Sequence, residues 1–213
     1  MQHQQRVAYV VALVVIGVCV LALPAPAQDN LLVDPGFDDP SLASWPPGYV
    51  VQGSWLWDAL DHSGSSASGS GRLENMYTGT TYTVTAGQCV NGVVAGLPFD
   101  AGVYIYFPTG QSATGYDWVQ LAVYPEPDCT GYYIDVLDTS EVTQASPGVW
   151  HLSRLTLPTA PGGAASVRFI PSNSKESAGG SLVIHFDDAF LVLGLFADGF
   201  ESGDTSAWSA TVP

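Results

Sequence analysis

Residues 101–107 read Ala-Gly-Val-Tyr-Ile-Tyr-Phe, and residues 117–124 read Asp-Trp-Val-Gln-Leu-Ala-Val-Tyr. Both stretches alternate with a period of two, which is typical of a β-strand that buries one of its faces. If the aliphatic sides face the core, the opposite sides carry Tyr104, Tyr106, Trp118, Gln120 and Tyr124. Two consecutive strands of this kind predict an aromatic surface suited to a ligand. Packing of these rings under loops or in the core is the alternative.

The same kind of segment recurs along the chain. Short runs rich in Val, Ile, Tyr, Thr and Trp alternate with clusters of Gly, Pro, Ser and Asp, and nothing after residue 27 keeps a helical period. We expect strands near residues 30–34, 49–57, 71–76, 81–90, 101–107, 117–124, 132–137, 149–157, 165–170 and 182–193. This pattern predicts an all-β, antiparallel β-sandwich that occupies residues 28–194 as one domain.

The first 27 residues predict an export signal. Arg6 precedes an apolar run from Val7 to Leu23, and small residues at Ala25 and Ala27 favour cleavage after Ala27. An uncleaved anchor helix is the alternative, because the run approaches the roughly 20 residues that span a bilayer. Cleavage predicts a secreted or extracellular protein with no membrane span left in it.

Two cysteines, Cys89 and Cys129, follow the expected signal. In an oxidising compartment we expect them to form a disulfide, with two free buried thiols as the alternative. On the chain-entropy model, closing a loop of this length stabilises a fold by roughly 4 kcal/mol.

Charge is the strongest bias of the composition. After Arg6 is removed, four basic residues remain against 20 acidic ones, which gives a net charge of −16. Nucleic acid and other anionic polymers are repelled by such a chain, whereas neutral ligands and divalent cations are not. Solubility of an exported protein is the simpler interpretation of the same charge.

Two stretches at opposite ends of the expected domain carry a family resemblance. Residues 30–38 read Asn-Leu-Leu-Val-Asp-Pro-Gly-Phe-Asp and precede Trp45, and residues 184–191 read Ile-His-Phe-Asp-Asp-Ala-Phe-Leu. Together with Val-Trp-His-Leu at 149–152 and Ala-Ala-Ser-Val-Arg-Phe at 164–169, they resemble CenC-like carbohydrate-binding modules. The resemblance spans residues 29–193. It implies a galactose-binding-like jelly roll, with the first and last strands side by side and with Trp45 and Trp150 packed.

A structural calcium ion is a further implication of this resemblance. Many such modules bind one through the acid after Gly-Phe and the first acid of the closing pair, which here are Asp38 and Asp187. Ca²⁺ takes six to eight oxygen ligands, so Asp34, Asp188 or backbone carbonyls would have to contribute. The family favours Glu where this chain has Asp38. The alternative to a calcium site is that these acids are exposed at the edge of a sheet and bind no ion.

Sugar binding needs flat apolar rings and a few polar groups beside them. Trp55 and Trp57, close to Asp58, form a second candidate pair besides the surface described above. We therefore predict a secreted, non-catalytic module for a neutral polysaccharide or cell-surface glycan. A structural or protein-interaction sandwich is the alternative, and a small secreted polysaccharide hydrolase or lyase is the second. The sequence has no Gly-x-Ser-x-Gly motif and no His pair at zinc spacing.

The segment 195–213 repeats the opening of the domain. Gly199-Phe200-Glu201 followed by Trp208 matches Gly36-Phe37-Asp38 followed by Trp45. We interpret this segment as a C-terminal tail outside the domain, either a recognition tag or a remnant that folds back onto it.

Overall fold

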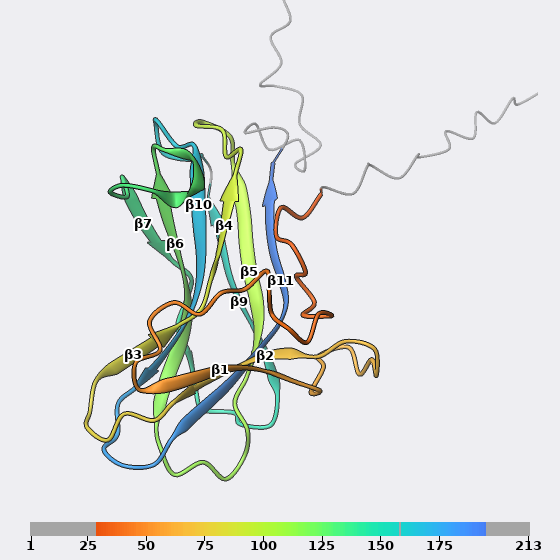
Figure 1. Ribbon diagram of the computed structural model, residues 1–213, viewed down its shortest axis with the longest axis vertical. Helices are drawn as coiled ribbons and strands as arrows, with labels where there is room; N and C mark the ends of the chain where they lie inside the picture. Colours follow the sequence, from red (N-terminus) through yellow and green to blue (C-terminus); the bar gives the residue numbers. More distant parts are fainter. Residues whose placement is uncertain (1–28, 158, 195–213) are drawn as a thin grey trace, which may run out of the picture.

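The computed structural model describes residues 29–157 and 159–194, which form two antiparallel sheets packed face to face (Figure 1). The expected export signal (1–27) and tail (195–213) lie outside the described residues. In chain order the elements are β1 (Gly53–Asp58), β2 (Ser70–Asn75), β3 (Tyr82–Thr85), β4 (Gln88–Asn91), β5 (Phe99–Tyr106), β6 (Gly115–Tyr124), a 3₁₀ turn (Pro127–Cys129), β7 (Asp135–Asp138), β8 (Val142–Thr143), β9 (Trp150–Leu157), β10 (Ser166–Lys175) and β11 (Leu182–Leu193). The predicted all-β sandwich is confirmed.

Each sheet combines strands that are distant in the sequence. The five-stranded sheet has the order β1-β2-β11-β5-β9. The six-stranded sheet has the order β3-β10-β6-β7, with β4 paired to β10 and β8 paired to β6. In this arrangement β5 and β6 follow each other in the sequence but belong to opposite sheets.

The core lies between the sheets and is built by the alternating strands. Val103 and Ile105 of β5 and Val119 and Leu121 of β6 are all fully buried, as their period of two predicts. Trp45 is also fully buried, and its ring stacks on Phe37 with the centroids 4.9 Å apart. The aliphatic sides of both quoted stretches therefore face the core.

Three details differ from the strands predicted. Residues 30–34 form no strand, and 32–34 are bends, although the segment lies beside the last strand, where the Leu31 N–H donates to the Leu191 carbonyl at 2.8 Å. The expected strand 81–90 is two strands, β3 and β4, since Ala86 and Gly87 between them take part in other contacts with residues 46–47. The short strand β8 was not predicted, because two residues carry no periodicity.

Trp45, Trp55 and Trp57 anchor the N-terminal segment on the sandwich. Their indole N–H groups donate to the carbonyls of Asp34, Trp45 and Phe37 at 2.8, 2.7 and 2.8 Å. The Trp55 ring lies so close over Gly71 that a Cβ there would meet it at 2.0 Å. Because Trp55 and Trp57 pack against the core, they do not form the solvent-facing pair that was predicted.

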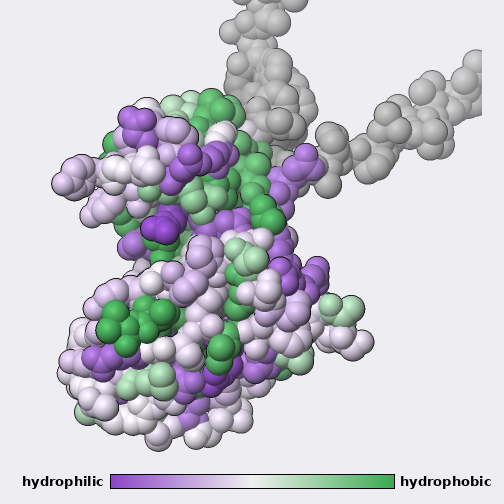
Figure 2. Space-filling model, viewed as in Figure 1, coloured by the Kyte–Doolittle hydropathy of each residue, from purple (hydrophilic) through white to green (hydrophobic). Residues whose placement is uncertain are grey.

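The disulfide between Cys89 and Cys129 is present and joins β4 to the 3₁₀ turn. Across the part of the chain that the structure describes, no helix is long and apolar enough to cross a membrane. On the face seen in Figure 2, polar and apolar residues are intermixed and the surface narrows to a waist between two lobes.

Candidate functional site

The aromatic surface predicted on β5 and β6 is divided between the two sheets. Tyr104 and Tyr106 lie on the outer face of the five-stranded sheet, whereas Trp118 and Gln120 lie on the outer face of the six-stranded one. The prediction of one shared surface is therefore wrong. Its physical reason is the connection 107–114, which crosses from one sheet to the other instead of forming a hairpin. Tyr124 is 9% exposed at the end of β6 and belongs to neither open surface.

A row of side chains crosses the outer face of the five-stranded sheet. The strand register places Leu56, Arg72, His185, Tyr106 and Trp150 side by side on β1, β2, β11, β5 and β9. At one end the Tyr106 and Trp150 rings are 5.2 Å apart. Toward the other end Arg72 forms an ion pair with Glu74 at 2.8 Å. Aromatic and charged groups are thus aligned across the strands.

A loop from the sheet edge adds a further ring to this row. His62, on the connection between β1 and β2, stacks on Tyr104 with the ring centroids 3.7 Å apart and an interplanar angle of 20°. Its ring is also 5.5 Å from that of Trp150, in an edge-to-face arrangement. We call His62, Tyr104, Tyr106 and Trp150 the aromatic cluster. All four side chains are partly exposed.

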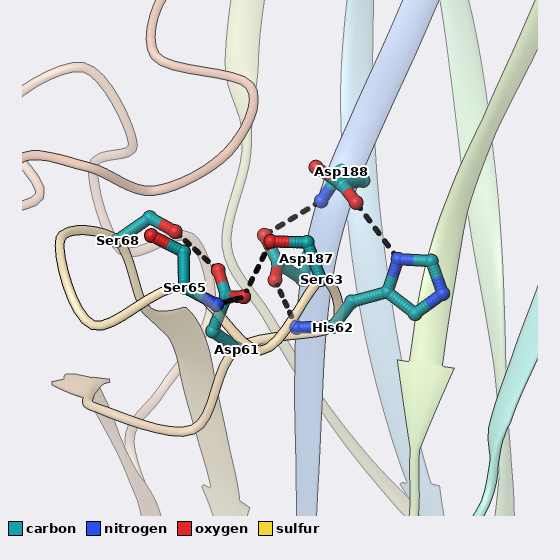
Figure 3. Close-up of polar contacts among 7 residues, drawn as sticks. All are labelled: Asp61, His62, Ser63, Ser65, Ser68, Asp187 and Asp188. Carbon is teal, nitrogen blue, oxygen red and sulfur yellow. Dashed lines mark hydrogen bonds and ion pairs between the residues drawn. The ribbon is translucent and has the colours of Figure 1, made fainter.

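Acidic residues on β11 hold this loop in place (Figure 3). The His62 backbone N–H donates to Asp187 Oδ2 at 2.7 Å, and its Nδ1 lies 2.7 Å from Asp188 Oδ2. Asp188 has a positive φ of 46° where the register between β11 and β5 shifts, so the bulge directs consecutive carboxylates to the loop. His62 is therefore held by three contacts: a hydrogen bond of its backbone N–H, a hydrogen bond at its ring Nδ1, and the stacking of its ring on Tyr104.

The loop is also closed on itself by Asp61. Its carboxylate accepts hydrogen bonds from the Ser63 and Ser68 hydroxyls and from the Ser65 backbone N–H at 2.6 Å (Figure 3). Burial raises the pKa of Asp61, but the hydrogen bonds from the serines outweigh it, and the net pKa is lowered. Asp61 is thus ionised and keeps the loop compact.

Two buried titratable groups lie on β11, Asp187 against the loop and His185 against Ser70 of β2. Asp187 is 1% exposed, and burial raises its pKa to about 7 despite two backbone hydrogen bonds. Burial also lowers the pKa of His185 to about 4, so this imidazole is neutral at neutral pH, with Nδ1 3.0 Å from the Ser70 hydroxyl. As predicted, both project from the same side of β11.

The residues predicted to bind calcium are at the same end of β11. An added Cβ on Gly36 would lie 3.9 Å from the exposed Asp38 carboxylate and 3.8 Å from that of Asp188. Asp187 instead directs its two oxygens to the backbone N–H groups of His62 and Asp188. Among the described residues, no three His, Cys, Asp or Glu side chains converge as metal ligands. Asp38 thus has Asp188 and not Asp187 as its neighbour beside Gly36, and calcium binding through Asp38 and Asp187 stays a prediction.

Sequence reasoning missed two members of the aromatic cluster. Trp150 was expected to pack, yet it lies on the outer face of β9. Arg154 and Thr156, which alternation places on the same face as Trp150, are the sequence signal that could have placed it outward. His62 lies in a loop with no periodicity, so its position over Tyr104 depends on tertiary contacts alone.

Comparison with solved structures identifies the fold. No protein-family model matches the chain, and no curated protein sequence matches it. The structure is similar to the enzymatically active domain of tailspike protein 4 of bacteriophage CBA120, with a TM-score of 0.58 and 14% identity over 78% of this chain. This chain spans 21% of the length of that solved domain.

Two further similar structures are carbohydrate-binding modules. One is TmCBM61, solved with β-1,4-galactotriose, with a TM-score of 0.52, 16% identity and coverage of 78% of this chain and 100% of the module. The other belongs to the β-sandwich superfamily of these modules, with a TM-score of 0.54, 12% identity and coverage of 78% and 62%. The chain therefore has the jelly-roll fold of β-sandwich carbohydrate-binding modules.

Proposed function

We propose that this protein is a secreted, non-catalytic module that binds a neutral glycan on the outer face of its five-stranded sheet. The observation that carries the proposal is the aromatic cluster, where His62, Tyr106 and Trp150 converge beside a row of polar groups. Aromatic rings of this kind cover the C–H faces of sugar rings, and neighbouring polar groups bind the hydroxyls.

The direction of the row indicates how a glycan lies. Leu56, Arg72, His185, Tyr106 and Trp150 occupy five neighbouring strands, so the row spans four strand spacings, or about 19 Å. That length accommodates several sugar rings in line. We place the stacked rings on Trp150 and Tyr106, and the hydroxyl contacts on Asp188 and Arg72, whose side chains are 47% and 24% exposed.

Charge and the fold comparison support the choice of ligand. The net charge of the whole chain is −15, which disfavours anionic polymers. The chain matches a carbohydrate-binding module over that module's full length but only 21% of the solved tailspike domain, which supports a binding role without catalysis. The disulfide between Cys89 and Cys129 supports export, since such bonds persist in oxidising compartments. We also propose a structural Ca²⁺ near Asp38 and Asp188, supported by their common position beside Gly36.

Calorimetric titration with neutral oligosaccharides tests the proposal. The series comprises β-1,4-galactotriose and the β-1,4-linked oligomers of xylose and glucose. We expect a Kd between micromolar and millimolar for at least one of them, and Trp150→Ala to weaken it at least tenfold, which corresponds to about 1.4 kcal/mol.

Tyr132→Ala is the matched control, because Tyr132 is 91% exposed on a loop of the other sheet. This variant removes an aromatic ring without touching the aromatic cluster. Absence of binding to all the oligosaccharides, or equal affinity of Trp150→Ala and the native chain, would refute the proposal.

A further inference from the structure

A second aromatic surface lies on the outer face of the six-stranded sheet. Tyr116 and Trp118 are two residues apart on β6, and their partly exposed rings stack with the centroids 5.4 Å apart and an interplanar angle of 30°. The residues between and after them, Asp117 and Val119, are fully buried. Since side chains two apart on a strand share a face, both rings project outward, away from the core.

Hydroxyl side chains border these rings on the neighbouring strands. In the register of the sheet, Trp118 is opposite Ser172 and Tyr116 is opposite Ser174. Ser172 and Ser174 are only 2% and 3% exposed, so they are not open to solvent although they lie on the outer side of the sheet. Beyond them, Thr85 and Thr83 occupy the same two rows on β3. The Thr83 hydroxyl donates to that of Ser174 at 3.3 Å.

A pocket continues the same surface. It measures about 450 Å³ and is lined by residues that include Tyr49, Thr85, Arg168 and Ile170. Thr85 lies two strand spacings from Trp118, or about 10 Å. Tyr49 is 55% exposed at this pocket, which adds a third aromatic ring. A volume of this size lies in the range of small-ligand sites.

A polar side chain also lies beside these rings, toward β7. Gln120 follows Trp118 on the same face of β6, and its amide donates to the Asp138 carboxylate of β7 at 3.3 Å. The surface thus combines two stacked rings, the partly exposed Thr83 and Thr85, a hydrogen-bonded amide and a pocket. We call Tyr116, Trp118, Gln120 and the pocket around Tyr49 the second face.

We propose that the second face is an independent binding site for a neutral glycan chain. Because it lies on the opposite sheet from the aromatic cluster, one molecule would hold two glycan chains, one on each side of the sandwich. Stacked sheets are about 10 Å apart, and their outer faces point in opposite directions. One short glycan cannot contact both faces, so the protein cross-links chains and gains avidity on a polysaccharide surface.

Binding stoichiometry separates the two sites. Calorimetric titration with the neutral oligosaccharide that binds best should give two sites on the native protein. Trp118→Ala and Trp150→Ala should each leave one site, and the double variant should leave none. Tyr116→Ala provides a second change on the same face, and Tyr132→Ala should keep both sites. Unchanged thermal unfolding of each variant shows that the fold is retained.

The outcomes for the two faces are distinguishable. One site on the native protein, lost in Trp150→Ala and kept in both Trp118→Ala and Tyr116→Ala, would overturn the second face and leave the proposed function intact. One site that is lost in Trp118→Ala and kept in Trp150→Ala would overturn both the two-chain model and the site proposed on the five-stranded sheet.

Cross-linking provides an independent readout. The native protein should raise the turbidity of a soluble neutral polysaccharide, and each single tryptophan variant should not. Equal turbidity with the native protein and with Trp118→Ala would also overturn the proposal.

Discussion

The imidazole of His62 lies on the phenol ring of Tyr104, with the ring centroids 3.7 Å apart. One face of Tyr104 is therefore covered, so this tyrosine supports the site and His62 presents the accessible ring. Asp188 fixes the other side of the imidazole through Nδ1 at 2.7 Å. A residue predicted from strand alternation to contact the ligand is thus covered on one face by a loop residue that no sequence pattern indicated.

Removing this ring should weaken glycan binding. We expect His62→Ala to raise the Kd by about three- to tenfold, since an aromatic contact contributes about 0.5–1.5 kcal/mol. His62→Phe, which keeps a flat ring on Tyr104, should lose less. Calorimetry with the same oligosaccharide provides the measurement. Tighter binding by His62→Ala would show that His62 obstructs the site and would contradict this role.

Trp55 should matter for stability and not for affinity. Its ring packs near Phe37 and Phe186, and its N–H donates to the Trp45 carbonyl at 2.7 Å. We expect Trp55→Ala to lower the free energy of unfolding by about 3–5 kcal/mol, because it leaves a cavity. Leu56→Ala, at the neighbouring position with its side chain 52% exposed, should change it by less than about 0.5 kcal/mol. Chemical denaturation compares them, and equal losses would disprove the assignment.

Asp117 should make stability depend on pH. It is fully buried, neither of its oxygens has a hydrogen-bond partner among residues 29–157 and 159–194, and burial raises its pKa well above 3.8. Above about pH 4 the unfolded chain releases this proton while the folded one keeps it. The contribution of Asp117 to the free energy of unfolding is therefore present at low pH. It is lost as the pH rises, by up to about 1.4 kcal/mol per pH unit.

Asp117→Asn removes this effect. The difference in unfolding free energy between Asp117→Asn and the native protein should grow in favour of the variant from pH 4 upward. Asp138→Asn, at an exposed position of β7, is the control and should show no such trend. Urea unfolding at a series of pH values measures it. A difference that stays constant with pH would contradict the prediction.

Calcium should stabilise the fold through Asp38. A cation that binds only the folded chain raises the midpoint of thermal unfolding with concentration. We expect a higher midpoint in millimolar Ca²⁺ than in EDTA, and Asp38→Asn should remove most of the increase. Asp138→Asn should respond as the native protein does. Identical midpoints in Ca²⁺ and EDTA would exclude the calcium site.

Local pattern was sufficient to predict most of the strands and the buried face of β5 and β6. Alternation placed Val103, Ile105, Val119 and Leu121 inside, and each of them is buried. The arrangement of those strands into sheets could not be predicted in the same way. Alternation defines which side of a strand is buried, but not which sheet the strand joins. Consequently Tyr104 and Trp118 were placed together, although the molecule separates them.

Periodicity could not predict the loop that carries His62 or the contacts that hold the N-terminal segment on the sandwich. The position of His62 depends on hydrogen bonds to Asp187 and Asp188, more than 100 residues away in the sequence. Trp55 and Trp57 have the composition of a sugar-binding pair, yet their N–H groups donate to backbone carbonyls of the segment that precedes β1. Tertiary partners decide between these roles, and a single sequence does not reveal them.

The indole N–H signals in a two-dimensional ¹H–¹⁵N spectrum test the central claim most directly. The chain has six tryptophans, and each provides one such signal. On saturation with the oligosaccharide that binds best, the Trp150 signal should move, whereas those of Trp45, Trp55 and Trp57, whose N–H groups donate inside the fold, should stay in place. A saturated complex in which the Trp150 signal does not move would contradict glycan binding on the five-stranded sheet.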